Sequence, residues 1–129
     1  MASTNKVVFD TSMLLSCGEL KIDAFDETRQ LLGNPGLFVT QTVEEEMAKL
    51  AKKGAKYRKN VAIAEILLEA NNVKRMPAQR IKKNADKELE ELAKKGYIVA
   101  TNDAQLRKKI KKNGGKCIIV MKKKFLAIE

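Results

Sequence analysis

The stretch Lys6-Val7-Val8-Phe9-Asp10 is a short apolar run that ends directly at an acid. Four more apolar runs follow along the chain, at residues 36–40, 72–76, 97–100 and 117–121. Continuous runs of β-branched and aromatic residues are typical of strands that are covered on both faces, as in a parallel sheet. The run at 72–76 is the weakest of the set. We therefore expect a mostly parallel sheet of about five strands.

The segments between these runs carry apolar residues at helical spacing. Residues 85–93 place alanine and leucine at positions i, i+4, i+7 and i+8, and Gly96 follows where a helix commonly ends. Residues 61–68 and 106–110 show related patterns. Strands that alternate with helices indicate an α/β domain. No repeat or linker interrupts residues 1–129, so we expect a single domain.

The chain is strongly basic. It has 26 Lys and Arg residues against 16 Asp and Glu residues, which leaves a formal net charge of +10 and a sequence pI of about 9.7. A surplus of this size favours a polyanionic partner, with nucleic acid first and an acidic membrane surface second. The plainer alternative is a protein that is merely Lys-rich, as many heat-adapted proteins are.

Histidine is absent from the chain, and only two cysteines occur, Cys17 and Cys117. Ser-His-Asp and Cys-His catalysis are therefore excluded, as are zinc sites built with imidazole. Two isolated cysteines form neither a disulfide framework nor a zinc knuckle, and free thiols are typical of a reducing compartment. No stretch resembles a signal peptide, and no run approaches the ~18 apolar residues of a membrane span. We expect a cytoplasmic protein.

Acidic residues stand where the predicted strands lead into helices. Asp10 follows the first apolar run, Asp86 opens the helix after the third, and Asp103 follows the fourth. Three glutamates at 44–46 lie in the first turns of the helix after the second run. Because ligands of a parallel sheet bind at the carboxyl ends of its strands, we expect these carboxylates at one rim. Without His or Cys, such a set suits a hard ion, Mg²⁺ or Mn²⁺.

Each of these acids also has a plainer interpretation. Residues 42–45 read as a helix capping box, and Asp86 and Asp103 each suit an ordinary helix N-cap. Asp10 is harder to explain in this way, because an acid that ends a buried strand needs a partner. Capping also does not require all four junctions to be acidic.

Four motifs resemble those of the PIN-domain ribonucleases. They occur in the family's order, at residues 7–15, 39–50, 85–86 and 100–107. The resemblance covers nearly the whole chain and is closest to an archaeal branch, VapC-like and related to rRNA-processing PIN proteins. Helical phase leaves Glu44 and Glu46 as equal candidates for the rim, whereas the family's second motif selects Glu46. The third motif departs from the family's pattern, because Asp86 is followed by Lys87 instead of further acids.

This resemblance implies a three-layer α/β/α sandwich and a metal-dependent endoribonuclease. One or two Mg²⁺ or Mn²⁺ ions would be held by the catalytic carboxylates Asp10, Glu46, Asp86 and Asp103. A carboxylate or a metal-bound water would be oriented by Thr11, Ser12, Thr101 and Asn102. The ions would activate water for attack on an RNA phosphodiester, with 5′-phosphate and 3′-hydroxyl products. The role would be that of a VapC-like toxin or of an rRNA-processing nuclease.

Positive charge is concentrated in a few runs. The group between two predicted helices is the best candidate for an RNA clamp: Lys52, Lys53, Lys56, Arg58 and Lys59. Arg107 begins a second run, and residues 80–83 and 122–124 carry others. Several runs around an acidic rim suit a phosphate backbone, although a single run is more often a solvated face. Aromatic residues are scarce, and Tyr57 alone has basic neighbours, so an RRM-type stacking platform is not expected.

Two other functions fit parts of this pattern. A PIN fold that binds RNA or protein in ribosome maturation, and cuts weakly or not at all, would explain the basic runs. A phosphoacceptor signalling domain needs adjacent acids after its first strand, whereas Asp10 is followed by Thr11.

The resemblance suggests a homodimer, with an antitoxin or a ribosome-assembly protein as a further partner. Apolar residues that suit such an interface, and equally suit a core, are Met13, Leu14, Leu31 and Leu32.

Overall fold

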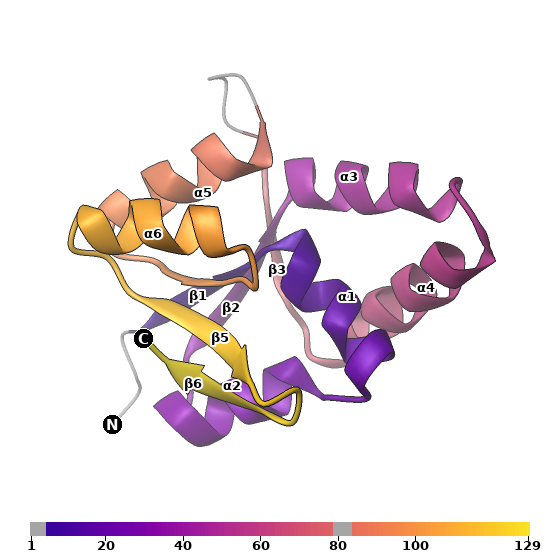
Figure 1. The fold of residues 1–129 in the computed structure, drawn as a ribbon, viewed down its shortest axis with the longest axis horizontal. Helices are drawn as coiled ribbons and strands as arrows, with labels where there is room; N and C mark the ends of the chain where they lie inside the picture. Colours follow the sequence, from indigo (N-terminus) through magenta and orange to yellow (C-terminus); the bar gives the residue numbers. More distant parts are fainter. Residues whose placement is uncertain (1–4, 79–83) are drawn as a thin grey trace.

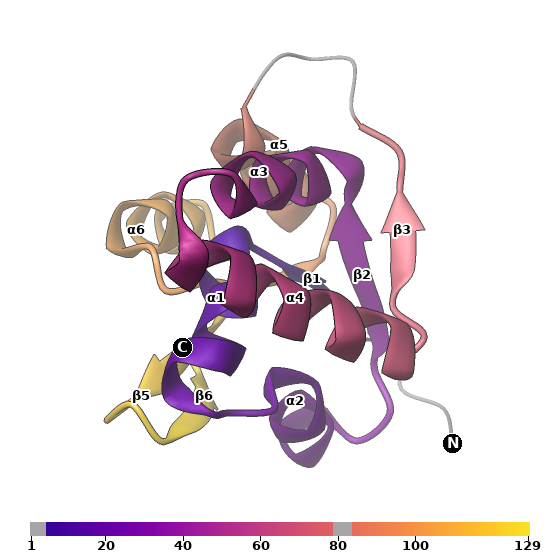
Figure 2. The same ribbon diagram turned by 90° about the vertical axis from the view of Figure 1, so that its right-hand side faces the viewer.

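The strands of the protein form one six-stranded sheet in a computed structural model that describes residues 5–78 and 84–129. Its order is β3-β2-β1-β4-β5-β6, and all neighbouring strands are parallel except β5 and β6. The strands are β1 (Lys6–Phe9), β2 (Gly36–Thr40), β3 (Lys74–Met76), β4 (Ile98–Ala100), β5 (Cys117–Met121) and β6 (Phe125–Ile128). Figure 2 shows β3 at one edge of the sheet, beside β2.

Helices cover both faces of this sheet (Figure 1). They are α1 (Thr11–Leu20), α2 (Ala24–Leu32), α3 (Gln41–Ala51), α4 (Ala55–Ala70), α5 (Ala85–Lys94) and α6 (Ala104–Lys112). The core on one face contains side chains of α1 to α4, and the core on the other contains those of α5 and α6. The three-layer α/β/α architecture predicted from the sequence is therefore confirmed.

Strand β1 shows why residues 7–9 are all apolar. Successive side chains of a strand point to opposite faces of the sheet. Val7 and Phe9 belong to the core under α1 to α4, whereas Val8 belongs to the core under α5 and α6. All three side chains are fully buried, so a polar residue at any of them would lie in a core.

The sixth strand was not predicted, and the expected number of five is corrected. Strand β6 pairs antiparallel with β5 through a tight turn, in which Lys122 and Lys123 have φ of 52° and 57°. Two successive left-handed residues are usually Asn or Gly, which form such hairpin turns without steric strain. Because both positions are lysines, the sequence carries no turn signal that would predict this hairpin.

The order of the strands locates the place where a ligand is expected. The chain moves from β1 outward to β2 and β3, and then returns to the other side of β1 to form β4 and β5. Binding crevices of α/β sheets open where the strand order reverses in this way. Asp10 follows β1 at this point, and its backbone N–H donates to the carbonyl of Ala100 on β4 at 2.9 Å.

The apolar residues considered for an interface separate in the structure. Met13 and Leu14 are fully buried in the core, which decides for ordinary packing at these two positions. Leu32 is half-buried against the same core, and Leu31 is 38% exposed. Within residues 5–78 and 84–129, no helix combines the length and apolarity that crossing a membrane requires.

Candidate functional site

Asp10 is held in one orientation at the end of β1, where it is the N-cap of α1. Its Oδ1 accepts the N–H of Thr11 at 2.8 Å, and its Oδ2 accepts the hydroxyls of Ser12 at 3.0 Å and Thr101 at 2.6 Å. Burial raises the pKa of Asp10, while these hydrogen bonds lower it and the charge of Asp86 adds to the rise. Asp10 is therefore well oriented but costly to ionise.

Two hydroxyls connect Asp10 to the loop after β4. Thr101 Oγ1 donates to Asp10 and accepts the backbone N–H of Asp103 at 3.0 Å. Ser12 Oγ donates to Asp10 and accepts the backbone N–H of Asn102 at 3.0 Å. Of the residues expected to orient the site, Ser12 and Thr101 bind Asp10 through their side chains. Asn102 contacts Ser12 through its backbone N–H.

Helix α3 brings Glu46 towards Asp10 and turns Glu44 away. Thr11 Oγ1, beside Asp10, donates a hydrogen bond to Glu46 Oε1. Glu44 Oε2 instead accepts from Arg75 Nε of the edge strand β3 at 2.7 Å. The spacing left these two glutamates equivalent, and their partners on other elements distinguish them.

Asp86 and Asp103 lie at the beginnings of α5 and α6, which pack side by side (Figure 1). Asp103 caps α6 through Oδ1, which accepts the N–H groups of Gln105 at 2.9 Å and Leu106 at 3.2 Å. Burial raises the pKa of Asp86, the carboxylates of Asp103 and Glu46 raise it further, and Lys109 lowers it. The acids of three helices therefore lie within electrostatic reach of one another.

The structure shows, for each acid, whether it caps a helix as the simpler interpretation expected. Asp103 is an N-cap, as that interpretation expected. The N-cap of α5 is Asn84, so Asp86 has no such role. Helix α3 begins earlier than a capping box at 42–45 requires, because its N-cap is Thr40, whose hydroxyl accepts from Val43 N–H at 3.1 Å.

The four carboxylates do not form a closed ligand set as they stand. In the part of the chain that the structure describes, no three Asp, Glu or Cys side chains are placed so that they hold an ion together. The chemistry of the donors nevertheless fits a hard cation, because neighbouring carboxylates raise the pKa of Asp10 and of Asp86, and a divalent ion relieves such repulsion. Glu46 is exposed and Asp86 is half-buried, so neither side chain is enclosed by the core.

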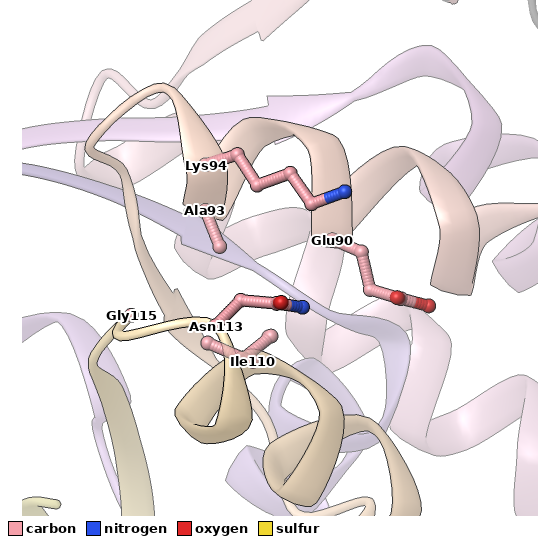
Figure 3. A pocket seen from close by; sticks show the side chains of 6 residues that line it. All are labelled: Glu90, Ala93, Lys94, Ile110, Asn113 and Gly115. Carbon is pink, nitrogen blue, oxygen red and sulfur yellow. The ribbon is translucent and has the colours of Figure 1, made fainter.

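Figure 3 shows a hollow between the C-terminal halves of α5 and α6, away from the acids at the beginnings of these helices. It is lined by Glu90, Ala93, Lys94, Ile110, Asn113 and Gly115. Its volume of about 10 Å³ is no larger than the space of one water molecule. This hollow is a packing gap and not a substrate site.

The basic residues expected to bind RNA are distributed unequally around the site. The group at 52–59 lies at the junction of α3 and α4, and all five of its side chains are exposed. Helix α3 has 11 residues, so this group lies about 16 Å along the helix from the end of β2. Arg107 Nε instead faces a carboxylate oxygen of Glu129 at 3.4 Å. The run at 80–83 lies outside the described residues.

Two contacts near the acids were not anticipated from the sequence. Lys109 of α6 lies near enough to Asp86 to lower its pKa. Thr42 Oγ1 of α3 donates to Glu88 Oε2 of α5 at 3.1 Å. In the sequence Lys109 is one lysine of a run and Glu88 is one acid of a helix, so neither carries a distinguishing signal.

Comparisons with known proteins concern the family and the fold of the chain. A family model described as a PIN like domain matches residues 7–124. The structure of the PIN domain endonuclease Utp24 has a TM-score of 0.75 and 26% identity, over 96% of this chain and 90% of that one. A domain of a functionally unknown protein from Methanocaldococcus jannaschii DSM 2661 has a TM-score of 0.62 and 16% identity, over 92% of each chain. VapBC-1 from nontypeable Haemophilus influenzae has a TM-score of 0.46 and 18% identity, over 82% of this chain and 92% of that one. No curated protein sequence matches the chain.

Proposed function

The chain belongs to the PIN-like domain family, and on this premise we propose that it is a metal-dependent endoribonuclease. It hydrolyses RNA phosphodiesters to 5′-phosphate and 3′-hydroxyl ends. The supporting observation is a chain of electrostatic effects among the acids: Asp103 and Glu46 raise the pKa of Asp86, and Asp86 raises that of Asp10. Acids from four separate junctions therefore share one electrostatic environment. The likeness to a PIN domain endonuclease supports the same activity.

The four acids are assigned to bind one or two Mg²⁺ or Mn²⁺ ions: Asp10, Glu46, Asp86 and Asp103. A divalent ion bound there supplies Lewis-acid chemistry, which acidifies a bound water and stabilises the leaving oxygen, so that no histidine base is needed. Thr101 and Ser12 keep the Asp10 carboxylate oriented before the substrate arrives. Thr11 does the same for Glu46.

The basic surface holds the RNA backbone over this site. The chain carries a formal net charge of +10 although its site is acidic, so attraction of a polyanion depends on residues outside the acids. The exposed group at 52–59 is assigned to this task. A VapC-like toxin and an rRNA-processing nuclease would both use this chemistry, and they differ in the RNA that they receive.

The test is cleavage of RNA in the presence of Mn²⁺. The wild type is expected to cut, and Asp10→Asn and Asp103→Asn are expected to fall to the rate measured in EDTA. Asp23→Asn is the matched control for Asp103→Asn, because Asp23 caps α2 through the same two N–H positions as Asp103 caps α6, and it lies outside the assigned site. Undiminished cleavage by both site variants would overturn the proposal. RNA binding by a wild type that never cuts would favour the RNA- or protein-binding module in ribosome maturation.

A further inference from the structure

A pocket between α1 and α4 lies outside the carboxylate site. Its volume is about 120 Å³, and it is lined by Leu15, Glu19, Lys56, Tyr57 and Asn60. We propose that this α1–α4 pocket takes one unpaired base of single-stranded RNA, with the neighbouring phosphate at the beginning of α4. The inference rests on the proposed function, because it takes RNA to be the substrate.

Asn60 is a buried polar residue that lines the pocket. Its side chain is 7% exposed, and within the described residues its amide makes no hydrogen bond. Among the described residues, its amide atoms are not counted with the polar atoms that are sealed from solvent without a partner, so the amide keeps contact with solvent where the residue lines the pocket. Gly18 of α1 makes room for it, since a Cβ at that position would collide with Asn60 Oδ1. Oδ1 therefore lies against Gly18, and a base that binds to this amide has no protein hydrogen bond to displace.

Tyr57 offers an uncommitted aromatic ring beside this amide. It is 42% exposed, and its ring takes part in none of the aromatic or cation–π contacts among the described residues. Tyr97, by contrast, packs edge-on against Phe38 with ring centroids 5.5 Å apart. Proteins that bind single strands stack bases on such free rings, whatever the base.

The beginning of α4 is suited to the adjoining phosphate. The N-cap Gly54 provides no side-chain hydrogen bond, whereas the N-cap side chains of the other five described helices do. The free N–H groups and the helix dipole favour an anion at this end. Lys52, Lys53 and Lys56 are exposed around it. This surplus of positive charge favours a nucleic acid over a protein segment as the occupant.

Helix α1 connects the pocket to the carboxylate site. Thr11, which hydrogen-bonds to Glu46, begins the helix, and Leu15 and Glu19 follow one and two turns later. Eight residues of helix separate Thr11 from Glu19, a distance of about 12 Å along the axis. One RNA strand of a few nucleotides therefore spans both places. A base held in the pocket would set which phosphodiester lies over the acids.

The first test measures RNA affinity in EDTA, where binding is separated from metal-dependent cleavage. Tyr57→Leu keeps an apolar side chain and removes the ring. Its affinity for a short labelled single-stranded RNA is expected to fall about 5- to 150-fold, as for loss of one stacked base. The slope of log affinity against log salt should stay at the wild-type value, because the phosphate contacts remain. Ile66→Ala, an exposed apolar residue on the same helix, is the control with wild-type affinity.

The second test uses tyrosine emission as a direct report on the pocket. The chain has no Trp and two Tyr, so a Tyr97→Phe variant leaves Tyr57 as the only tyrosine. RNA is expected to quench its emission, and inorganic polyphosphate, which has charge but no bases, is expected to leave it unchanged.

Wild-type RNA affinity in Tyr57→Leu, or equal quenching by polyphosphate, would overturn the inference and leave the pocket to a protein partner. The proposed function is tested separately, by whether the wild type cleaves RNA in the Mn²⁺ assay. A wild type that cuts RNA while Tyr57→Leu binds normally would refute the pocket alone.

Discussion

Asp10 combines two requirements that oppose each other. The proposed role in binding a cation requires a charged Asp10, yet it lies almost buried where β1 ends, and this burial raises its pKa. Donors from Thr11, Ser12 and Thr101 compensate only in part. Proteins commonly accept such a cost where chemistry needs the group, which is why perturbed carboxylates concentrate at functional sites.

Removing the charge of Asp10 is expected to stabilise the metal-free protein. Its pKa in the folded state lies above the ordinary value of 3.8, so the fold loses stability as the pH rises from about 3.8 to the raised pKa, and the loss persists at higher pH. In EDTA, Asp10→Asn should unfold a few degrees above the wild type at pH 7, and the difference should vanish towards pH 3. Thermal unfolding across this pH range measures it. A variant less stable than the wild type at every pH would show that the hydrogen bonds of the carboxylate outweigh its desolvation.

Thr101 is expected to act on the site by positioning Asp10. Thr101→Val preserves shape but removes the hydrogen bonds of a fully buried hydroxyl with Asp10, Ser12 and the backbone N–H of Asp103. Loss of such an outer partner should reduce cleavage about 10- to 100-fold and raise the Mn²⁺ concentration for half-maximal activity. The folded state should lose about 1–3 kcal/mol, because polar partners are left unmet.

The control for this substitution is Thr28→Val. Thr28 is equally buried, and its hydroxyl donates to the carbonyl of Ala24 at 2.7 Å within α2. It should lose some stability and keep the wild-type cleavage rate and Mn²⁺ dependence. An unchanged Mn²⁺ dependence in Thr101→Val would contradict a positioning role.

At the scale of elements, the assigned site is built from helix beginnings. Asp10 and Asp103 are the N-caps of α1 and α6, and Asp86 lies in the first turn of α5. A carboxylate at these positions also meets the free N–H groups and the dipole of its helix. The same side chains therefore cap helices and carry the proposed metal binding, so substitutions must be chosen that change one role and keep the other.

Asp103 allows this separation directly. Asp103→Asn keeps a good cap, so its stability should stay near that of the wild type while its cleavage is lost. Asp103→Ala should lose the cleavage and also about 1 kcal/mol of stability. Asp23→Ala on α2 removes an equivalent cap, with hydrogen bonds of 3.0 Å to Phe25 and Asp26, and should lose only stability. Paired denaturation and cleavage assays decide, and full cleavage by Asp103→Asn would leave Asp103 as a cap alone.

At the scale of the whole molecule, the chain holds a small acidic rim on a strongly basic body. The rim lies where the strand order reverses beside β1, and it brings together acids from distant parts of the chain. The surrounding positive charge does not neutralise the acids fully, since Asp10 and Asp86 keep raised pKa values. A bound divalent ion should therefore stabilise the fold as a whole.

Excess Mn²⁺ is expected to raise the unfolding temperature of the wild type. A ligand that binds only the folded state at 100 times its Kd adds about 2.7 kcal/mol, which corresponds to about 5–15 °C for a domain of this size. The rise should shrink as the pH falls through the raised pKa of Asp10 and Asp86, because protons compete for the same oxygens. Calorimetry with Mn²⁺ and with EDTA provides the measurement. An equal rise in Asp10→Asn would place the ion elsewhere.

The candidate acids could be found in the sequence, because each follows an apolar run that is recognisable as a strand. Their separate partners could not, since Arg75 is 31 positions from Glu44 and Thr11 is 35 positions from Glu46. The α1–α4 pocket was equally hidden. Tyr57 stood out by its basic neighbours, but the unpaired amide of Asn60 exists only where Gly18 lets two helices approach.

Periodicity by itself determined the α/β class, the parallel core strands and the order of the acidic junctions, because burial on one or both faces selects residues locally. The tertiary structure decided what depends on distant neighbours: which glutamate turns to the rim, how burial raises the pKa of Asp10, and that β6 completes the sheet. Contacts between distant segments and loss of water are properties of the packed molecule, and a linear pattern does not encode them residue by residue.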